Sequence, residues 1–139
     1  MIKSFDDIVN QVKSSKNRRI AVAVAQDADI LEALDKAKGA DIADAVLIGN
    51  QDEIEAVARS SKIDVKPFEI IDIREESLAV KRAIELIKHG EADLLMKGLC
   101  STATLLKEVL NKDNGLRGRG LLSHLAIFEI PTYPKLILM

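Results

Sequence analysis

The sequence predicts a single α/β domain, a three-layer αβα arrangement around a mostly parallel sheet. Short runs of small and β-branched apolar residues alternate with segments whose apolar residues recur every three or four positions. Such alternation is typical of strand–helix–strand units, in which helices cover both faces of a sheet. The chain has 139 residues, 47% of them hydrophobic, which suits one domain with a core that needs no disulfide.

Six strands are expected from these apolar runs. They are Ile20–Ala25, Ala43–Ile48, Phe68–Ile73, Ala92–Met96, Leu121–Ile130 and Lys135–Met139. The first four follow the pattern of buried parallel strands. The link at Pro131–Pro134 is too short for a parallel crossover, so the last two strands are expected to form an antiparallel hairpin. The order of the strands in the sheet stays open.

Four amphipathic helices are expected before residue 90, three of them after a polar residue suited to an N-cap. They run from about 5 to 13 after Ser4, from 28 to 39 after Asp27, onward from 51 after Asn50, and from about 75 to 89. A fifth helix is expected after the fourth strand, where Leu105, Leu106, Val109 and Leu110 recur at helical spacing.

The segment EADLLMKGLCSTATLLKEVL at 91–110 reads as strand, tight turn and helix. Lys97 and Gly98 end the strand, and Ser101, Thr102 and Thr104 place hydroxyl groups where the helix begins. Free backbone N–H groups and the positive end of a helix dipole favour an anion, and a nearby lysine strengthens that preference. The same residues also fit an ordinary N-cap after a βα turn. The spacing alone leaves both interpretations open.

Gln26 and Asp27 follow the first strand, and they are a second candidate group. In open α/β sheets, ligands bind outside the carboxyl ends of the strands. Both Gln26–Asp27 and Lys97–Thr104 follow such ends, so their proximity depends on the strand order.

Composition argues against several classes of function. A net charge of −2 with mixed signs, one Tyr, three Phe and no Trp argue against nucleic-acid binding. The apolar runs are too short to cross a membrane. A single cysteine, Cys100, permits no internal disulfide and favours a cytoplasmic location. Its place at a helix start lowers the pKa of a thiol. No cluster has metal-ligand spacing.

Several ordered motifs resemble the N-terminal half of the phosphate acetyl/butyryltransferase family, nearest its phosphate butyryltransferase members. They are IAVAVAQD, IADAVLIGN, ADLLMKGL, the TAT helix start, VLNK, GLR and SHLAIFE. The resemblance implies transfer of a short acyl group between coenzyme A and inorganic phosphate, both as substrates, with no permanently bound cofactor. It also implies a homo-oligomer and one domain of a fold similar to that of isocitrate and isopropylmalate dehydrogenases.

Taken together with the strand and helix ends described above, the candidate substrate- or phosphate-binding residues are Lys97, Gly98, Ser101, Thr102, Thr104, Lys107, Arg117, His124, Gln26 and Asp27. Lys107 falls where relatives have an arginine, and a lysine there keeps the charge but loses bidentate geometry. It can equally be a solvated helix lysine. Arg117 lies in a glycine-rich loop and either meets phosphates or is solvated. For His124 a polar role in the cleft and a structural role both stay open.

Members of this family continue past the position of Met139 into a second domain that carries residues usually given catalytic roles. The apolar ending at Leu136–Met139 also favours a longer polypeptide. The chain is therefore expected to be the N-terminal domain of an acyltransferase, inactive alone, with its catalytic residues unassigned. The alternative is a non-catalytic α/β module that binds an anion or nucleotide, or that self-associates.

Overall fold

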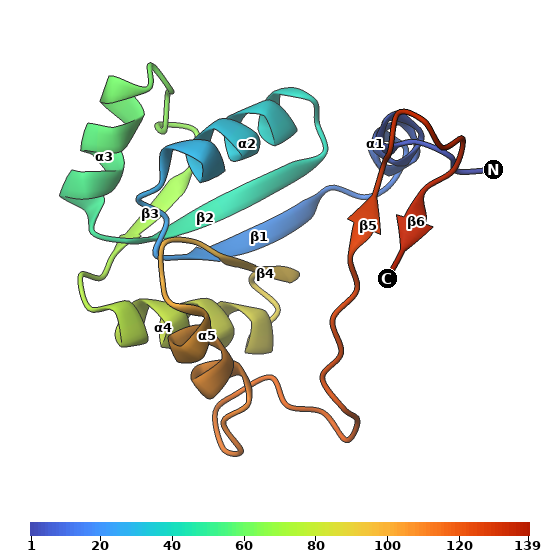
Figure 1. The fold of residues 1–139 in the computed structure, drawn as a ribbon. Helices are drawn as coiled ribbons and strands as arrows, with labels where there is room; N and C mark the ends of the chain where they lie inside the picture. The colour runs from blue at the N-terminus through green and yellow to red at the C-terminus, as the bar shows by residue number, and fades with distance from the viewer. The chain divides into compact units, whose positions relative to one another are not determined.

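The computed structural model describes residues 1–139, and the chain divides into two compact units (Figure 1). The larger unit is Asn17–Arg117, and the smaller combines Met1–Lys16 with Gly118–Met139. No helix in the structure is long and apolar enough to span a bilayer.

The larger unit is built on a parallel sheet of four strands in the order β3-β2-β1-β4. Their bounds are Arg18–Ala23 for β1, Ala43–Gly49 for β2, Glu69–Asp72 for β3 and Leu94–Lys97 for β4. The predicted parallel sheet is confirmed. β1 ends two residues earlier than expected, because Val24 has a φ of +62° and leaves the extended conformation.

Helices cover both faces of this sheet, as the three-layer prediction requires (Figure 1). They are α2 (Ala28–Gly39), α3 (Gln51–Ser60), α4 (Glu76–Lys88) and α5 (Thr102–Val109). Successive residues of β1 serve opposite faces. Ala21 and Ala23 pack in the cluster that contains α4 and α5, while Val22 packs with α2 and α3. Both central strands are therefore buried on two sides.

The strand order contains one reversal. From β1 the chain adds β2 and then β3 on one side, and after α4 it returns to add β4 on the other side of β1. The carboxyl ends of β1 and β4 thus lie at the topological switch point, where open α/β sheets bind ligands. This strand order could not be predicted from the sequence.

The fourth strand differs from expectation. Instead of a buried strand at Ala92–Met96, β4 spans Leu94–Lys97 at the edge of the sheet. Leu94 is 51% exposed, and Leu95 and Met96 are only partly buried. The reason is that β4 pairs with β1 alone, so its other side has no neighbour in this chain.

Two of the predicted caps in this unit are confirmed and one is wrong. Asp27 Oδ1 accepts the Ile30 N–H at 3.0 Å, and Ser101 Oγ accepts the Thr104 N–H at 3.0 Å. Asn50 occupies the N-cap position of α3 but makes no side-chain cap. The first N–H of that helix is instead bound by Asp72 Oδ1 at the end of β3, at 3.0 Å.

The smaller unit contains α1 (Phe5–Lys13), β5 (Ile127–Phe128) and β6 (Ile137–Leu138). Ser4 and Asp7 form a capping box at the start of α1, which confirms that prediction. β5 and β6 pair antiparallel, so the predicted hairpin is also confirmed. The long strand expected at Leu121–Ile130 is wrong. Residues 121–126 have no regular structure and Leu121 is 99% exposed, because no neighbouring strand pairs with this segment.

Candidate functional site at the ends of β1 and β4

The two candidate segments meet at the switch point. Ala23 of β1 and Lys97 of β4 are register partners. Beyond them the Gly98 N–H donates to Ala23 O at 2.9 Å, and the Leu99 N–H donates to Val24 O at 2.8 Å. The segments after both strands are therefore fixed side by side, as the ligand-binding rule for such sheets requires.

Gly98 is required at this contact because there is no room for a side chain. A Cβ atom on Gly98 would lie 2.1 Å from Val24 O and 2.5 Å from Ala23 O, both of them backbone atoms. Val24 itself is a β-branched residue in the left-handed region, a conformation that costs about 1–3 kcal/mol. The turn after β1 is thus strained at the point where it contacts the Lys97–Gly98 bend.

The entrance of α5 holds a carboxylate from another helix. Glu76, the first residue of α4, accepts the Ser101 backbone N–H on Oε1 at 2.9 Å. The Ser101 hydroxyl donates to Thr104 Oγ1 at 2.8 Å, which joins the two hydroxyls. The Ser101 N–H, followed by the Thr104 hydroxyl, lowers the pKa of Glu76 below its usual value, and Lys97 adds to the effect. The place predicted to favour an anion therefore contains one.

Sequence reasoning did not identify Glu76 as a site residue. An acidic residue in the first turn of a helix is normally explained by that helix's own dipole. Its contact with Ser101 joins positions 25 residues apart, so only the packing of α4 beside α5 reveals it.

Lys97 lies at the same entrance. Its side chain is exposed, and Nζ lies 3.4 Å from Gly98 O. Its positive charge acts on both Glu76 and Cys100. Lys97 forms no ion pair within 4.0 Å, so its ammonium group is available to a second anion.

Gln26 and Asp27 stand at the predicted edge, but their polar atoms contact other elements. Gln26 Nε2 donates to Glu53 Oε2 on α3 at 3.2 Å. Its Oε1 is buried without a partner, at a place where a Cβ on Gly49 would come within 2.3 Å. The Asp27 carboxylate caps α2. Both side chains thus fix the neighbouring helices around the switch point.

The remaining candidates are spread along the chain. Thr102 is exposed at the start of α5, and Lys107 is exposed in its last turn. Arg117 is exposed at the end of the larger unit, and His124 is exposed within the smaller unit. The structure therefore brings together Lys97, Gly98, Ser101 and Thr104, with Glu76 added.

Cys100 differs from expectation. Its side chain is buried, at 1% exposure, and Sγ lies 3.8 Å from Ala23 O. Burial raises the pKa of this thiol, and the nearby Lys97 charge and the Gly98 backbone N–H offset only part of that rise. The helix start does not make Cys100 a reactive thiolate.

Native Cys100 is therefore expected to react with 5,5′-dithiobis(2-nitrobenzoate) at pH 8 at least about 100-fold more slowly than in the guanidinium-unfolded chain. The readout is the absorbance of the released thionitrobenzoate with time. Similar rates in the folded and unfolded chain would show that the thiol is accessible and ionised.

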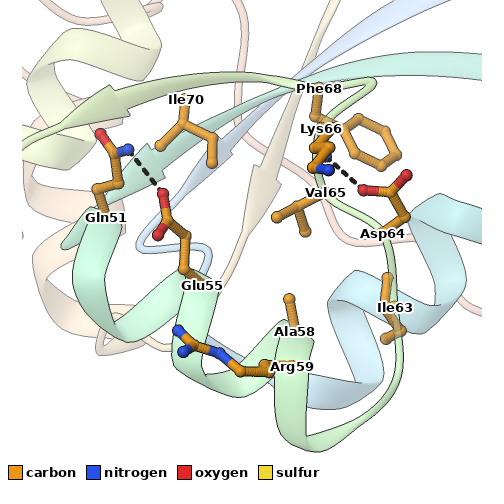
Figure 2. A pocket seen from close by; sticks show the side chains of 10 residues that line it. All are labelled: Gln51, Glu55, Ala58, Arg59, Ile63, Asp64, Val65, Lys66, Phe68 and Ile70. Carbon is orange, nitrogen blue, oxygen red and sulfur yellow. Dashed lines mark hydrogen bonds between the residues drawn. The ribbon is translucent and has the colours of Figure 1, made fainter.

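A cavity lies away from this site. It has a volume of about 720 Å³ between α3 and the segment from Ile63 to Ile70 (Figure 2). Its lining combines apolar side chains such as Val65 and Phe68 with Glu55, Arg59, Asp64 and Lys66, charges of both signs. None of the predicted site residues lines it, and Gln51 and Glu55 already bond to each other at 2.7 Å.

Comparison with known proteins identifies the family. A family model described as phosphate acetyl/butaryl transferase matches residues 4–83, more than half of the chain. This chain belongs to the phosphate acetyl/butyryltransferase family. The match to the family model ends before Lys97, but individual members of the family align over the whole chain.

Among those members, a phosphate butyryltransferase from Clostridium acetobutylicum is 46% identical over all 139 residues, which are 46% of its length. One from Clostridium beijerinckii is 40% identical over the same span, again 46% of its length. A phosphate acetyltransferase from Rickettsia felis is 32% identical over 133 residues, 96% of this chain and 38% of that protein. The chain thus spans less than half the length of these relatives.

Solved structures of phosphotransacylases share the fold. A branched-chain phosphotransacylase from Enterococcus faecalis superposes with a TM-score of 0.63 at 23% identity, covering 87% of this chain and 40% of that one. A phosphotransacetylase from Staphylococcus aureus gives 0.65 at 17% identity, covering 96% and 49%. These likenesses support the α/β architecture; the similarity to isocitrate and isopropylmalate dehydrogenases stays a prediction.

Proposed function

We propose that this chain is the N-terminal domain of a phosphate acyltransferase similar to phosphate butyryltransferase. In the proposed reaction, a phosphate oxygen attacks the thioester carbonyl of a short acyl-CoA. The carbon–sulfur bond breaks, and acyl phosphate and the CoA thiolate are released. The observation that carries this proposal is 46% identity over the whole chain to a phosphate butyryltransferase.

The α5 entrance is the proposed phosphate-binding wall. Acyl transfer to phosphate needs a site for a multiply charged anion and donors for the oxyanion that develops at the carbonyl. Lys97 supplies a free positive charge, and Ser101, Thr102 and Thr104 supply hydroxyls at a positive helix end. Gly98 lets this wall lie against β1, since any side chain there would collide with backbone.

Other candidates have secondary roles in this proposal. Lys107 and Arg117 carry exposed positive charges that suit further phosphate groups, such as those of coenzyme A. Gln26 and Asp27 hold α3 and α2 around the site. His124 has no assigned step. A cytoplasmic, oligomeric enzyme acting on small molecules fits this chemistry, and light scattering tests the oligomeric state.

The 139-residue chain is expected to have no measurable turnover alone, because it spans less than half of its relatives' length. The test joins the chain to the remaining C-terminal part of the Clostridium acetobutylicum relative. Release of CoA thiol from butyryl-CoA is measured with and without phosphate. Phosphate-dependent release by the chimera and none by the chain alone is the expected result. Rapid turnover by the chain alone, or a folded chimera inactive on short acyl-CoAs, would contradict the proposal.

A self-associating module is the second candidate, favoured by the edge strand β4. One side of this strand is unpaired. Leu94, its first residue, is 51% exposed, and Leu99 just after the strand is 59% exposed. Unprotected edges of this kind pair readily with another chain. Light scattering combined with calorimetric titration of coenzyme A separates the two. Oligomers without any heat of CoA binding favour the module, and CoA binding favours a half-site of the enzyme.

A further inference from the structure

The α5 entrance already binds an acidic group of the chain itself. Glu76 Oε1 accepts the Ser101 N–H at 2.9 Å, and the hydroxyls of Thr104 and Ser101 and the charge of Lys97 all act on the same carboxylate. These are the groups that the proposed function gives to substrate phosphate. The entrance therefore accommodates the anionic oxygen of a carboxylate.

Glu76 and a phosphate group cannot both accept the hydrogen bond of the Ser101 N–H at the same time. The Ser101 N–H is a single donor and its hydrogen already points to Glu76 Oε1. A phosphate brought beside Lys97 would also meet the negative charge of Glu76, and like charges at such short range repel. For phosphate to bind, the carboxylate must move or become neutral.

The Glu76 carboxylate is held by uncharged hydrogen-bond donors. These are the Ser101 N–H at 2.9 Å and the hydroxyls of Thr104 and Ser101, and the residue is partly exposed. It forms no ion pair within 4.0 Å. The neighbouring Glu75, the N-cap residue of α4, differs because its Oε1 accepts the Ser77 hydroxyl at 2.5 Å. Two adjacent glutamates thus have separate environments, one at the α5 entrance and one outside it.

We propose that Glu76 is an internal competitor of substrate phosphate at the start of α5 and a determinant of phosphate affinity. This inference rests on the proposed function for the location of the phosphate. Glu76 holds the hydroxyls and the Ser101 N–H in a binding arrangement when the site is empty. The Glu76 carboxylate leaves the Ser101 N–H when an anion of higher charge binds beside Lys97. The resting site therefore discriminates against weakly charged anions.

The test is a titration of inorganic phosphate at pH 7.5 into the 139-residue chain and its variants, followed by the backbone amide shifts of Ser101 and Thr104. Glu76→Gln keeps an oxygen acceptor but removes the charge, and Glu76→Ala removes both. Each is expected to lower the Kd for phosphate at least about tenfold. Glu75→Gln is the matched control and is expected to leave the Kd within about twofold. Circular dichroism confirms that each variant folds.

An unchanged Kd in folded Glu76→Gln and Glu76→Ala would overturn the inference, and so would the absence of phosphate-dependent shifts in all four chains. An equal gain in Glu75→Gln would also overturn it, because the effect would then be one of net charge. The acyl-transfer assay of the chimera is read separately. An inactive chimera beside tighter phosphate binding by Glu76→Gln would reject the proposed reaction and leave the competitor role standing.

Discussion

Replacing Gly98 by alanine is expected to lower the free energy of unfolding by about 3 kcal/mol or more, which is in the range of severe overpacking. The new methyl group would lie 2.1 Å from Val24 O and 2.5 Å from Ala23 O. Both contacts are backbone, so no side chain can rotate away. Relief requires β4 to move from β1, which weakens the bonds from the Gly98 and Leu99 N–H groups. Urea unfolding followed by circular dichroism measures the change.

Gly39→Ala is the control for this experiment. Gly39 closes α2, and a Cβ there would meet nothing within 4 Å. Alanine is therefore expected to leave stability unchanged or to raise it by about 0.5–1 kcal/mol, since it loses less backbone entropy on folding. A Gly98→Ala chain as stable as the Gly39→Ala chain would show that the two strand ends are not in close contact.

Replacing Lys97 by alanine in the chimeric acyltransferase is expected to reduce kcat/KM for phosphate by about 100-fold, the usual effect of removing one charged group that stabilises an anionic transition state. Lys97 is the positive charge at the α5 entrance; its Nζ donates to Gly98 O at 3.4 Å but has no carboxylate within 4.0 Å. Arginine at this position is expected to restore part of the activity, because it keeps the charge with a different geometry. Initial rates of CoA release at varied phosphate give kcat and KM separately.

Lys36→Ala is the matched control, because Lys36 is an exposed lysine of α2 whose partner is Glu32 at 2.5 Å. Its loss is expected to change kcat/KM by less than about twofold, since exposed pairs of this kind contribute little. A Lys97→Ala enzyme with wild-type kinetics would remove Lys97 from the site. Equal losses in both variants would point to a general effect of charge.

Features fixed by neighbouring residues were predictable from the sequence. The caps at Ser4, Asp27 and Ser101 depend on contacts three residues apart, and all three form as expected. Asn50 failed because its competitor, Asp72, is 22 positions away in the sequence and reaches α3 only once β3 lies beside β2. Local patterns identify a cap position, while the sheet decides which side chain fills the role.

In the candidate site, too, local features were predictable from the sequence and long-range contacts were not. The Lys97–Gly98 bend and the hydroxyls of α5 were identified from spacing, and their meeting with the end of β1 needed the strand order. The direction of the Cys100 pKa shift was predicted wrongly and Glu76 was not identified, and both errors have the same cause. Burial against β1 outweighs the helix-end effect on the thiol, and the packing of α4 beside α5 brings the carboxylate to Ser101. Both effects depend on elements far apart in the chain.

Four alanines lie among larger apolar side chains in the layer between α4 and the sheet, Ala21 and Ala23 from β1 and Ala79 and Ala83 from α4. All four are buried in a close-packed interior, so there is little room for a larger side chain at these positions. A valine at Ala83 would lift α4 and carry its first turn, with Glu76, away from the α5 entrance. Substitutions in this buried layer would thus change the affinity for ligands while every residue that contacts a ligand stayed the same.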